Sequence, residues 1–203
     1  MRTTAARKAQ TRERILAAAG ELFRRQGIDA IGVDAIMHRA GMTHGGFYAH
    51  FASKEALVAE MTAAALACSA ARWERLSKET DPLTALAGIV ESYLDPAHVA
   101  AAERGCILPT LGPEIARRCD ARPAITASIR RMLEALSKCL PGRRRQQALQ
   151  TLSGMVGAVM LARLCDDAQL AGEFLAAARP AVGLRTRQGR PPPAGAALSG
   201  ASR

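Results

Sequence analysis

Apolar residues recur every three or four positions along most of this chain, which is the spacing that places them on one face of an α-helix. The clearest stripe contains Ile15, Ala19 and Phe23. It predicts a helix over residues 6–26, and Gly27 suits the left-handed position just beyond a helix end. Apolar and polar residues do not alternate cleanly in any stretch, and β-branched residues are few. The pattern therefore predicts an all-α fold.

Capping and helix-breaking residues divide the rest of the chain into further helices. Two short helices are predicted over residues 33–39 and 43–51, with Gly41 between them. Ser53 suits the N-cap of a long helix that runs to about residue 78. Further helices are predicted just before Gly105 and over residues 82–95, 113–119, 124–140, 144–165 and 169–181.

A long helix followed by two short ones around a tight turn is the helix-turn-helix arrangement, whose last helix enters the major groove of DNA. Residues 41–51 suit that helix because they combine small residues, which allow close approach to a duplex, with hydroxyl and imidazole groups that bind phosphates. Met42, Phe47 and Phe51 are expected to pack inward against the preceding helices. The residues left for the outer face are Thr43, His44, Gly45, Tyr48 and His50.

Several short motifs occur together near the N-terminus. They are Thr11-Arg12-Glu13-Arg14-Ile15-Leu16, Val33-Asp34-Ala35-Ile36, Ala40-Gly41-Met42-Thr43, Gly45, Phe47-Tyr48, His50-Phe51 and Ser53-Lys54-Glu55-Ala56-Leu57. In this combination about the first 60 residues resemble the TetR (TetR/AcrR) family of transcriptional regulators. The resemblance implies an all-α protein with an N-terminal three-helix helix-turn-helix domain, followed by a larger helical ligand-binding and dimerisation domain.

The resemblance also implies how the chain divides. The helix-turn-helix DNA-binding domain is expected over residues 1–53, and the ligand-binding and dimerisation domain over residues 54–182. Residues 183–203 are rich in proline, glycine and arginine and hold little apolar material, so we expect a disordered basic tail there.

A homodimer that binds a palindromic DNA operator is the assembly that the resemblance implies. Thr43, His44 and Gly45, at the start of the second short helix, would then approach base edges and nearby phosphates. Two departures from the family pattern stand out. Gly32 occupies a position where a capping Ser or Thr is common, and Asp34 is the residue that could partly replace that cap. His44 stands where the family often has lysine, and imidazole is mostly neutral at pH 7.

Phosphate contacts are assigned by the same resemblance. Tyr48 and His50 would bind phosphates through the phenol and the imidazole, and Lys54 would add a contact at the N-terminus of the long helix. Arg14, on the first helix, would add long-range attraction to the duplex. Two alternatives stay open: Tyr48 is a packed aromatic side chain, and His50 only caps the end of its helix.

The last two long helices carry many small and apolar residues. The resemblance implies that they form a four-helix dimer interface, with two helices from each subunit, because binding to a palindromic site requires a dimer. An ordinary core face within one chain is the alternative. The residues assigned to the interface are Leu152, Met155, Val159, Met160, Leu170 and Phe174.

The middle helices are expected to enclose a cavity for a hydrophobic or mildly polar small molecule. Cys106 follows Arg104 and Gly105 near a predicted helix start, and both a helix N-terminus and a nearby arginine favour a reactive thiolate. Cys106 is therefore a candidate electrophile sensor, with a buried structural thiol as the alternative. The candidate lining residues, for which plain core packing is the alternative, are Met61, Trp73, Tyr93, Cys106, Leu111 and Met132.

Charge adds a partner class to this picture. The chain has 28 Lys and Arg residues against 18 Asp and Glu, a net charge of +10, which points to a polyanion partner. Residues 1–14 carry five positive side chains and one negative, which suits attraction to DNA. Residues 179–203 carry five arginines and no acid, so half of the excess charge lies far from the helix-turn-helix motif.

The same composition sets other classes aside. No apolar run is long enough to span a membrane and no secretory signal is present, so we expect a cytoplasmic protein without a membrane partner. The five cysteines show no C-x-x-C spacing, and the histidines are not clustered with them at the spacing of metal ligands. We therefore expect free thiols, no metal and no cofactor. No catalytic triad or phosphate loop is visible, so we expect no enzyme.

The sequence therefore predicts a DNA-binding transcriptional regulator. We expect a repressor that binds its operator as a homodimer and is released by a small-molecule or electrophile inducer. The alternatives are a thiol-dependent enzyme that uses Cys106 and a non-specific basic nucleic-acid-binding protein.

Overall fold

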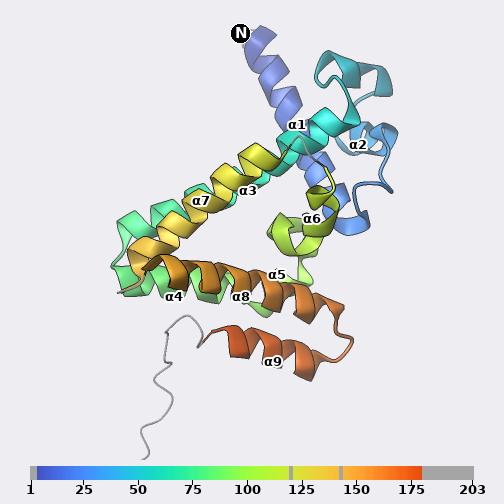
Figure 1. Ribbon diagram of the computed structural model, residues 1–203. Helices are drawn as coiled ribbons and strands as arrows, with labels where there is room; N and C mark the ends of the chain where they lie inside the picture. Colours follow the sequence, from blue (N-terminus) through green and yellow to red (C-terminus); the bar gives the residue numbers. More distant parts are fainter. Residues whose placement is uncertain (1–3, 119–120, 142–143, 180–203) are drawn as a thin grey trace, which may run out of the picture.

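The computed structural model describes residues 4–118, 121–141 and 144–179, and within these ranges all regular structure is helical (Figure 1). The predicted all-α fold is thus confirmed. The tail expected over residues 183–203 and the thiol of Cys119 lie outside the described residues. In chain order the elements are α1 (Thr4–Gln26), α2 (Val33–Arg39), the 3-10 helix η1 (His44–Ala49), α3 (Lys54–Glu79), α4 (Pro82–Tyr93), α5 (Pro96–Ala100), the 3-10 helix η2 (Ala102–Arg104), α6 (Ile107–Ala116), α7 (Arg122–Cys139), α8 (Arg144–Leu164) and α9 (Ala168–Ala178).

The helix boundaries follow the local chemistry of capping residues. Gly27 has a φ of 84°, the left-handed conformation predicted for the residue after α1. The Ser53 hydroxyl accepts a hydrogen bond from the amide of Ala56 at 3.1 Å and so caps α3. The Asp81 carboxylate accepts from the amides of Leu83 and Thr84 at the start of α4, where Pro82 takes the first helical position.

Two predicted helices differ from the observed ones. The helix predicted over residues 113–119 is wrong, because α6 begins at Ile107 and includes Pro113. Ile107, Leu111 and Ile115 lie one turn apart and are all buried, and this apolar face outweighs the hydrogen bond that proline removes. The second short helix is a 3-10 helix that ends at Ala49, two residues before Phe51. Adjacent glycines at its start disfavour regular α-helix.

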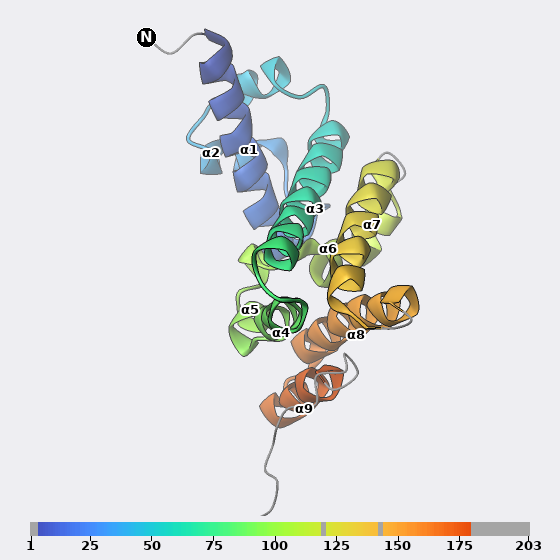
Figure 2. The same cartoon turned by 90° about the vertical axis from the view of Figure 1, so that its left-hand side faces the viewer.

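Two hydrophobic cores organise the chain. The first joins α1, α2, η1 and the first half of α3 around Phe23 and Phe47, and α6 adds its buried face to it. The second joins the later half of α3 with α4, α7 and α8 around Trp73 and Met155. α3 therefore contributes to both cores, and it runs beside α7 (Figures 1 and 2).

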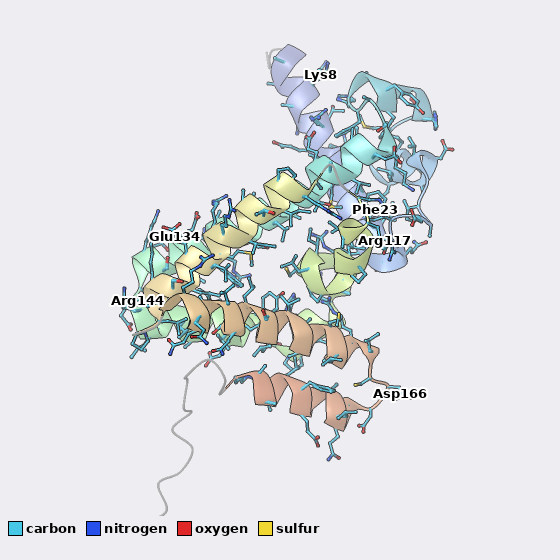
Figure 3. The ribbon with its side chains drawn as sticks, in the orientation of Figure 1. Lys8, Phe23, Arg117, Glu134, Arg144 and Asp166 are labelled. Atoms are coloured by element: carbon cyan, nitrogen blue, oxygen red, sulfur yellow. The ribbon has the colours of Figure 1, made fainter. Side chains whose placement is uncertain are left out.

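The two ends of the described chain lie at the periphery of the fold, although α9 contributes Leu175 to the second core. The N-terminal part of α1 projects away from the other helices, and Figure 3 shows Lys8 on this projecting part. At the other end, α9 lies along α8 on the outside of the molecule (Figure 1). The regions of the chain assigned to DNA contact and to dimerisation therefore lie on opposite sides.

Candidate DNA-binding surface and effector cavity

The helix-turn-helix is held by aromatic packing beneath η1. Phe47 is fully buried and Phe51 nearly so, and their rings stack with centroids 5.7 Å apart. Met37 of α2 is fully buried as well, and a Cβ added to Gly46 would lie 3.6 Å from its Cε. The inward packing predicted for Phe47 and Phe51 is observed, and it directs the remaining residues of η1 outward.

The outward face of η1 is open to solvent. Tyr48 is 64% exposed, and its ring meets Phe47 only edge-on, at 5.3 Å between centroids. Thr43, His44 and Gly45 are exposed too. A Cβ added to Gly45 would meet no described atom within 4 Å, and the residue has no positive φ. The fold of this chain therefore does not require glycine at position 45.

Asp34 contacts His44 rather than capping α2. Gly32 is the N-cap of α2, and no side-chain hydrogen bond caps that helix, so the partial cap considered for Asp34 is not formed. Its carboxylate instead hydrogen-bonds and pairs with the His44 Nδ1 at the start of η1. Both side chains are exposed, so an acidic group lies beside the first residue of the outward-facing helix.

Arg12 of α1 contacts both α3 and the C-terminal end of η1. This role was not predicted from the sequence. Its guanidinium pairs with both carboxylate oxygens of Glu60 on α3 and donates to the backbone carbonyl of His50. It also lies 4.1 Å from the centroid of the Phe51 ring. Arg12 and Glu60 lie far apart in the sequence, so no local periodicity signals that they pair.

His50 occupies the end of η1 and lies beside these cations. Partial burial, followed by the charges of Lys8 and Arg12, lowers the pKa of its imidazole. Its Nδ1 is buried without a hydrogen-bond partner among the described residues, while its backbone forms the C-cap of η1. A neutral His50 offers a phosphate one N–H donor but no charge.

Arg14 and Lys54 have partners within the chain. The Arg14 guanidinium donates to the carbonyl of Ala40 at 2.6 Å, beside Gly41, whose φ is 69°. It therefore supports the turn between α2 and η1. The Lys54 ammonium, at the first position of α3, lies 6.0 Å from the centroid of the Phe23 ring.

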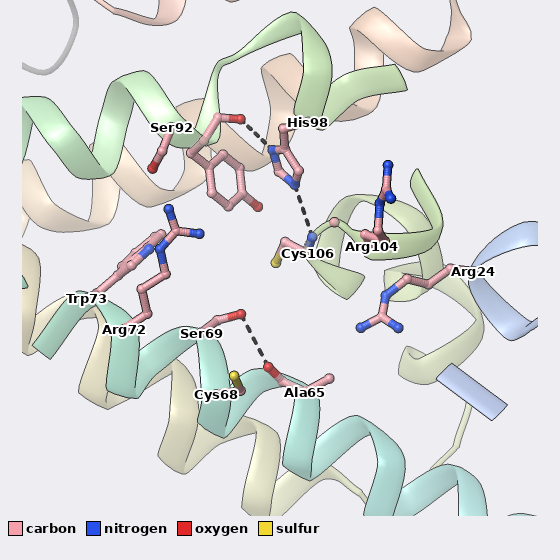
Figure 4. Close-up of a pocket in the computed structure, with 12 residues that line it drawn as sticks. Arg24, Ala65, Cys68, Ser69, Arg72, Trp73, Ser92, His98, Arg104 and Cys106 are labelled. Atoms are coloured by element: carbon pink, nitrogen blue, oxygen red, sulfur yellow. Dashed lines mark hydrogen bonds between the residues drawn. The ribbon is translucent and has the colours of Figure 1, made fainter. Parts of the chain in front are cut away.

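A cavity of about 360 Å³ opens between α3, α4 and the start of α6 (Figure 4). Three of the residues proposed from the sequence, Trp73, Tyr93 and Cys106, line it. The other three are buried in the cores away from its lining: Met61 and Leu111 in the first core, Met132 in the second. The residues that line it are Arg24, Ala65, Cys68, Ser69, Arg72, Trp73, Ser92, Tyr93, His98, Arg104, Gly105 and Cys106.

His98 fixes the position of Cys106 at one wall of this cavity. Its Nδ1 donates to the carbonyl of Tyr93 at 2.6 Å, and its Nε2 accepts from the amide of Cys106 at 3.0 Å (Figure 4). A ring nitrogen that accepts is unprotonated, so the imidazole is neutral. Burial is the main cause that lowers the pKa of His98, and the charges of Arg163 and Arg72 lower it further.

Arg163 reaches the same wall from α8. Its guanidinium donates to the carbonyls of His98 and Val99 and, at 2.5 Å, to the hydroxyl of Thr110 on α6. Burial lowers its pKa, although Tyr93 and Cys106 act in the opposite direction. A third helix is thereby joined to the segment that carries Cys106.

α6 links the cavity to the helix-turn-helix domain. One end begins directly after Cys106. Towards the other end, the Glu114 carboxylate accepts from the amide of Ile28 at 2.7 Å, just beyond the end of α1. Arg118 pairs with Asp29 in the same connection. A displacement of α6 would therefore be transmitted to α1 through polar contacts as well as through the shared core.

Residues assigned to the dimer interface fall into two groups. Leu152, Met155 and Val159 are buried in the chain's own second core, so for these three the intrachain alternative describes the packing. Phe174 is half-buried, whereas Met160 and Leu170 are exposed. The exposed large apolar residues of α8 and α9 are called here the α8–α9 face, and they are Leu149, Met160, Leu161, Leu164 and Leu170.

The described cysteines form no disulfide. Cys68, Cys106, Cys139 and Cys165 are free thiols, and burial raises the pKa of Cys139. Within the described ranges, no helix has both the length and the apolar character that a membrane crossing needs.

Comparison with known proteins finds a match for the helix-turn-helix region. Residues 15–61 match the family model of bacterial regulatory proteins, tetR family. A stretch of 53 residues is 45% identical to TtgW of Pseudomonas putida, an uncharacterized transcriptional regulator of the helix-turn-helix type. The match covers 26% of this chain and 40% of TtgW, so it spans less than half of that relative's length.

Solved structures extend the likeness to most of the fold. The reduced form of Escherichia coli NemR superposes with a TM-score of 0.72 at 23% identity, over 84% of this chain and 96% of that one. A TetR-family regulator from Agrobacterium tumefaciens gives 0.72 at 22% identity, over 87% and 97%. SCO4454 of Streptomyces coelicolor, also a TetR-family regulator, gives 0.70 at 20% identity, over 86% and 95%.

The relatives named here are described as transcriptional regulators, and none of them is described as an enzyme. Residues 15–61 thus match the DNA-binding region of the tetR family of bacterial regulatory proteins, and the described fold as a whole is similar to that of solved TetR-family regulators.

Proposed function

We propose that this protein is a repressor that binds a palindromic DNA operator as a homodimer and releases it when a small molecule occupies the cavity. The observation that carries DNA binding is the outward face of η1, where Thr43, His44 and Tyr48 are exposed beside Gly45. Since the fold does not require glycine at position 45, close approach of a duplex is a reason for its presence. The projecting end of α1, which carries Lys8, supplies positive charge (Figure 3), and Lys54 adds a cation at the start of α3.

The proposal of a dimer is supported by the α8–α9 face. Large apolar residues gather there although few other large apolar side chains of the described chain are exposed. Exposed apolar surface of this kind is typical of an interface. Two copies joined through this face would carry two helix-turn-helix units, as a palindromic site requires.

The proposal of release by a ligand is supported by the position of the cavity. Occupation would act on Cys106 and the start of α6, whose other end holds the connection between α1 and α2 through Glu114. The ligand must bind better to a conformation in which the two recognition helices no longer match the operator. A repressor, rather than an activator, is the simplest regulator that such release produces.

An electrophile is the second candidate effector, because the thiol of Cys106 lines the cavity. Treatment with an alkylating reagent should weaken operator binding by the wild type but not by Cys106→Ser. Cys68→Ser, which removes the other thiol of the cavity, is the matched control and should respond as the wild type does. Unchanged binding by a protein with Cys106 demonstrably alkylated would refute this candidate.

The function as a whole is tested by titration with operator DNA against random DNA at one fixed salt concentration. The operator is sought as an inverted repeat in the DNA that flanks the gene. A specific regulator is expected to prefer it by about a thousandfold or more. A small ratio would instead support the non-specific nucleic-acid-binding protein.

A further inference from the structure

The cavity beside α6 is lined by three arginines and, among its described lining residues, by no acid. Arg24 comes from α1, Arg72 from α3 and Arg104 from η2. Figure 4 shows Arg24 and Arg72 approaching the space from different sides, while Arg104 lies at its edge. The excess of positive charge is therefore assembled from three elements that are far apart in the sequence.

Within the described residues, neither Arg24 nor Arg72 pairs with a carboxylate, in contrast to Arg75, which pairs with Glu79 outside the cavity. One Arg24 nitrogen donates to the carbonyl of Gly20, but its Nε is buried without a hydrogen-bond partner. Burial lowers the pKa of Arg24, which is the electrostatic cost of a cation held without a counter-charge.

Tyr93 adds a second unsatisfied group to the same cavity. The residue is 6% exposed, and its hydroxyl is buried without a conventional hydrogen-bond partner among the described residues. It interacts with the thiol of Cys106, which is only a weak donor and acceptor. Burial, with a smaller effect of Cys106, raises the pKa of Tyr93 well above its ordinary value, so the hydroxyl keeps its proton and remains a donor.

The unsatisfied donors of Arg24 and Tyr93 both require a hydrogen-bond acceptor. Buried polar groups in folded proteins are nearly always satisfied, yet the Arg24 Nε and the Tyr93 hydroxyl both lack an acceptor within the described chain. Ser69 and Ser92 line the same space, where the indole of Trp73 and the methyl of Ala65 provide apolar wall. A ligand that completes the cavity must supply negatively charged acceptor oxygens on a small apolar body.

We propose that the effector of this regulator is a small organic anion, a carboxylate or phosphate ester with an apolar body, whose acid group binds Arg24, Arg72 and the Tyr93 hydroxyl. The inference rests on the proposed function, since it names the ligand class of the cavity through which release would occur. The apolar body lies against Trp73. A cavity of about 360 Å³ holds a molecule with a single ring and a short acidic side chain.

The test uses direct binding and needs no operator. Trp73 is the single tryptophan of the chain and lines the cavity, so its fluorescence reports occupancy. Phenylacetate and phenyl phosphate are titrated against phenylacetamide, which has nearly the shape of phenylacetate and no charge. We expect at least one anion to bind about tenfold or more tightly than the amide. Equal binding of the amide, or no binding of either anion at millimolar concentration, would overturn the proposal.

Two variants locate the contact. Arg72→Gln should weaken anion binding about tenfold and leave amide binding unchanged, whereas Arg75→Gln, one turn further along α3 and outside the cavity lining, should leave both unchanged. Tyr93→Phe keeps the ring and should weaken anion binding several-fold. Anion binding that falls equally in Arg72→Gln and Arg75→Gln would show attraction by the general charge of the protein and would refute the assigned site.

Failure of this inference is distinguishable from failure of the proposed function. If the operator is bound specifically but the amide binds as well as the anions, the regulator stands and the ligand class is wrong. If the anions bind at Arg72 but specific operator binding is absent, the ligand class stands and the proposed function is wrong.

Discussion

The side chains of η1 divide by burial into a structural set and an exposed set. Phe47 is fully buried and holds the helix on the first core, while the neighbouring Tyr48 is 64% exposed. Two adjacent aromatic residues thus have opposite surroundings. A phenol that the fold leaves in solvent loses little when it binds a phosphate, because it gives up few contacts within the chain.

Replacement of Tyr48 tests its assignment to phosphate. Tyr48→Ala should weaken operator binding about tenfold through the lost contact. The melting temperature should change little because the side chain is mostly exposed. Tyr48→Phe separates the hydroxyl from the ring and should show most of the loss if the phenol is the binding group. Retained affinity in a gel-shift titration would remove Tyr48 from the contacts.

His98 gives stability a pH dependence. Its pKa is lowered from the ordinary 6.5 in the folded chain, so below pH 6.5 the unfolded chain binds more protons than the native one. The stability that neutral His98 contributes is fully present above pH 6.5 and is lost as the pH falls below that value. Melting temperatures of the wild type should therefore fall on acidification more steeply than those of His98→Asn. Parallel pH profiles would contradict this role, and the comparison cancels the contribution of His50, which both proteins share.

At the scale of elements, Arg12 and Glu114 each connect two elements through polar contacts. Arg12 of α1 joins the end of η1 to α3, and Glu114 of α6 joins the end of α1 to the cavity segment. Each is a charged side chain that satisfies backbone or charged groups of another element. Such contacts define the angle between helices more sharply than apolar packing, because their geometry is directional.

Removal of Arg12 tests the first junction. Arg12→Gln should reduce the free energy of unfolding by about 1–3 kcal/mol, because it leaves Glu60 and the His50 carbonyl without their partner. Operator affinity should fall as well, since the end of η1 is no longer held. Arg25→Gln is the control, because Arg25 is exposed and lies 4.0 Å from its partner Glu21. Urea unfolding curves that coincide for the wild type and Arg12→Gln would show that the network is dispensable.

At the scale of the whole molecule, η1 and the two helices that carry the α8–α9 face lie at opposite ends of the molecule (Figure 1). The cavity lies between them, in contact with helices that belong to both cores. α3 supplies buried residues to both cores, and α6, whose buried face lies in the first core, contacts α8 of the second. A ligand between them can therefore alter the relation of the two ends without unfolding either core.

Introducing charge into the α8–α9 face tests the dimer. Leu164 is 75% exposed, so Leu164→Glu should leave a single chain folded but disfavour an apolar interface by burying a carboxylate. We expect sedimentation to show a monomer and operator affinity to fall. Leu83→Glu is the matched control, since Leu83 is 63% exposed and belongs to α4, which supplies no residue to the face. A dimer that persists in Leu164→Glu with unchanged sedimentation would place the interface elsewhere.

Much of the fold was predictable because its signals are local. The stripe around Phe23, the left-handed Gly27 and the caps at Ser53 and Asp81 are each encoded within a few residues. α6 was misplaced because its apolar face at Ile107, Leu111 and Ile115 is buried by a distant helix, whereas Gly112 and Pro113 are read locally as a break. Local propensity was overridden by tertiary packing.

The candidate sites show the same division. The motif around Thr43 and Tyr48 could be recognised in the sequence because it is one continuous segment, and its contacts with DNA stay a prediction. The arginines of the cavity could not, because Arg24 and Arg72 are 48 positions apart and only the packing of α1 against α3 brings them to one space. Leu152 and Leu164 lie on different faces of α8, both of them apolar, and only the positions of the other helices decide that the first is buried and the second exposed. The sequence by itself determined the helices, their caps and the helix-turn-helix motif, since these depend on neighbours along the chain. The tertiary structure alone decided which charges meet and which apolar faces stay open, since burial and electrostatics depend on neighbours in space.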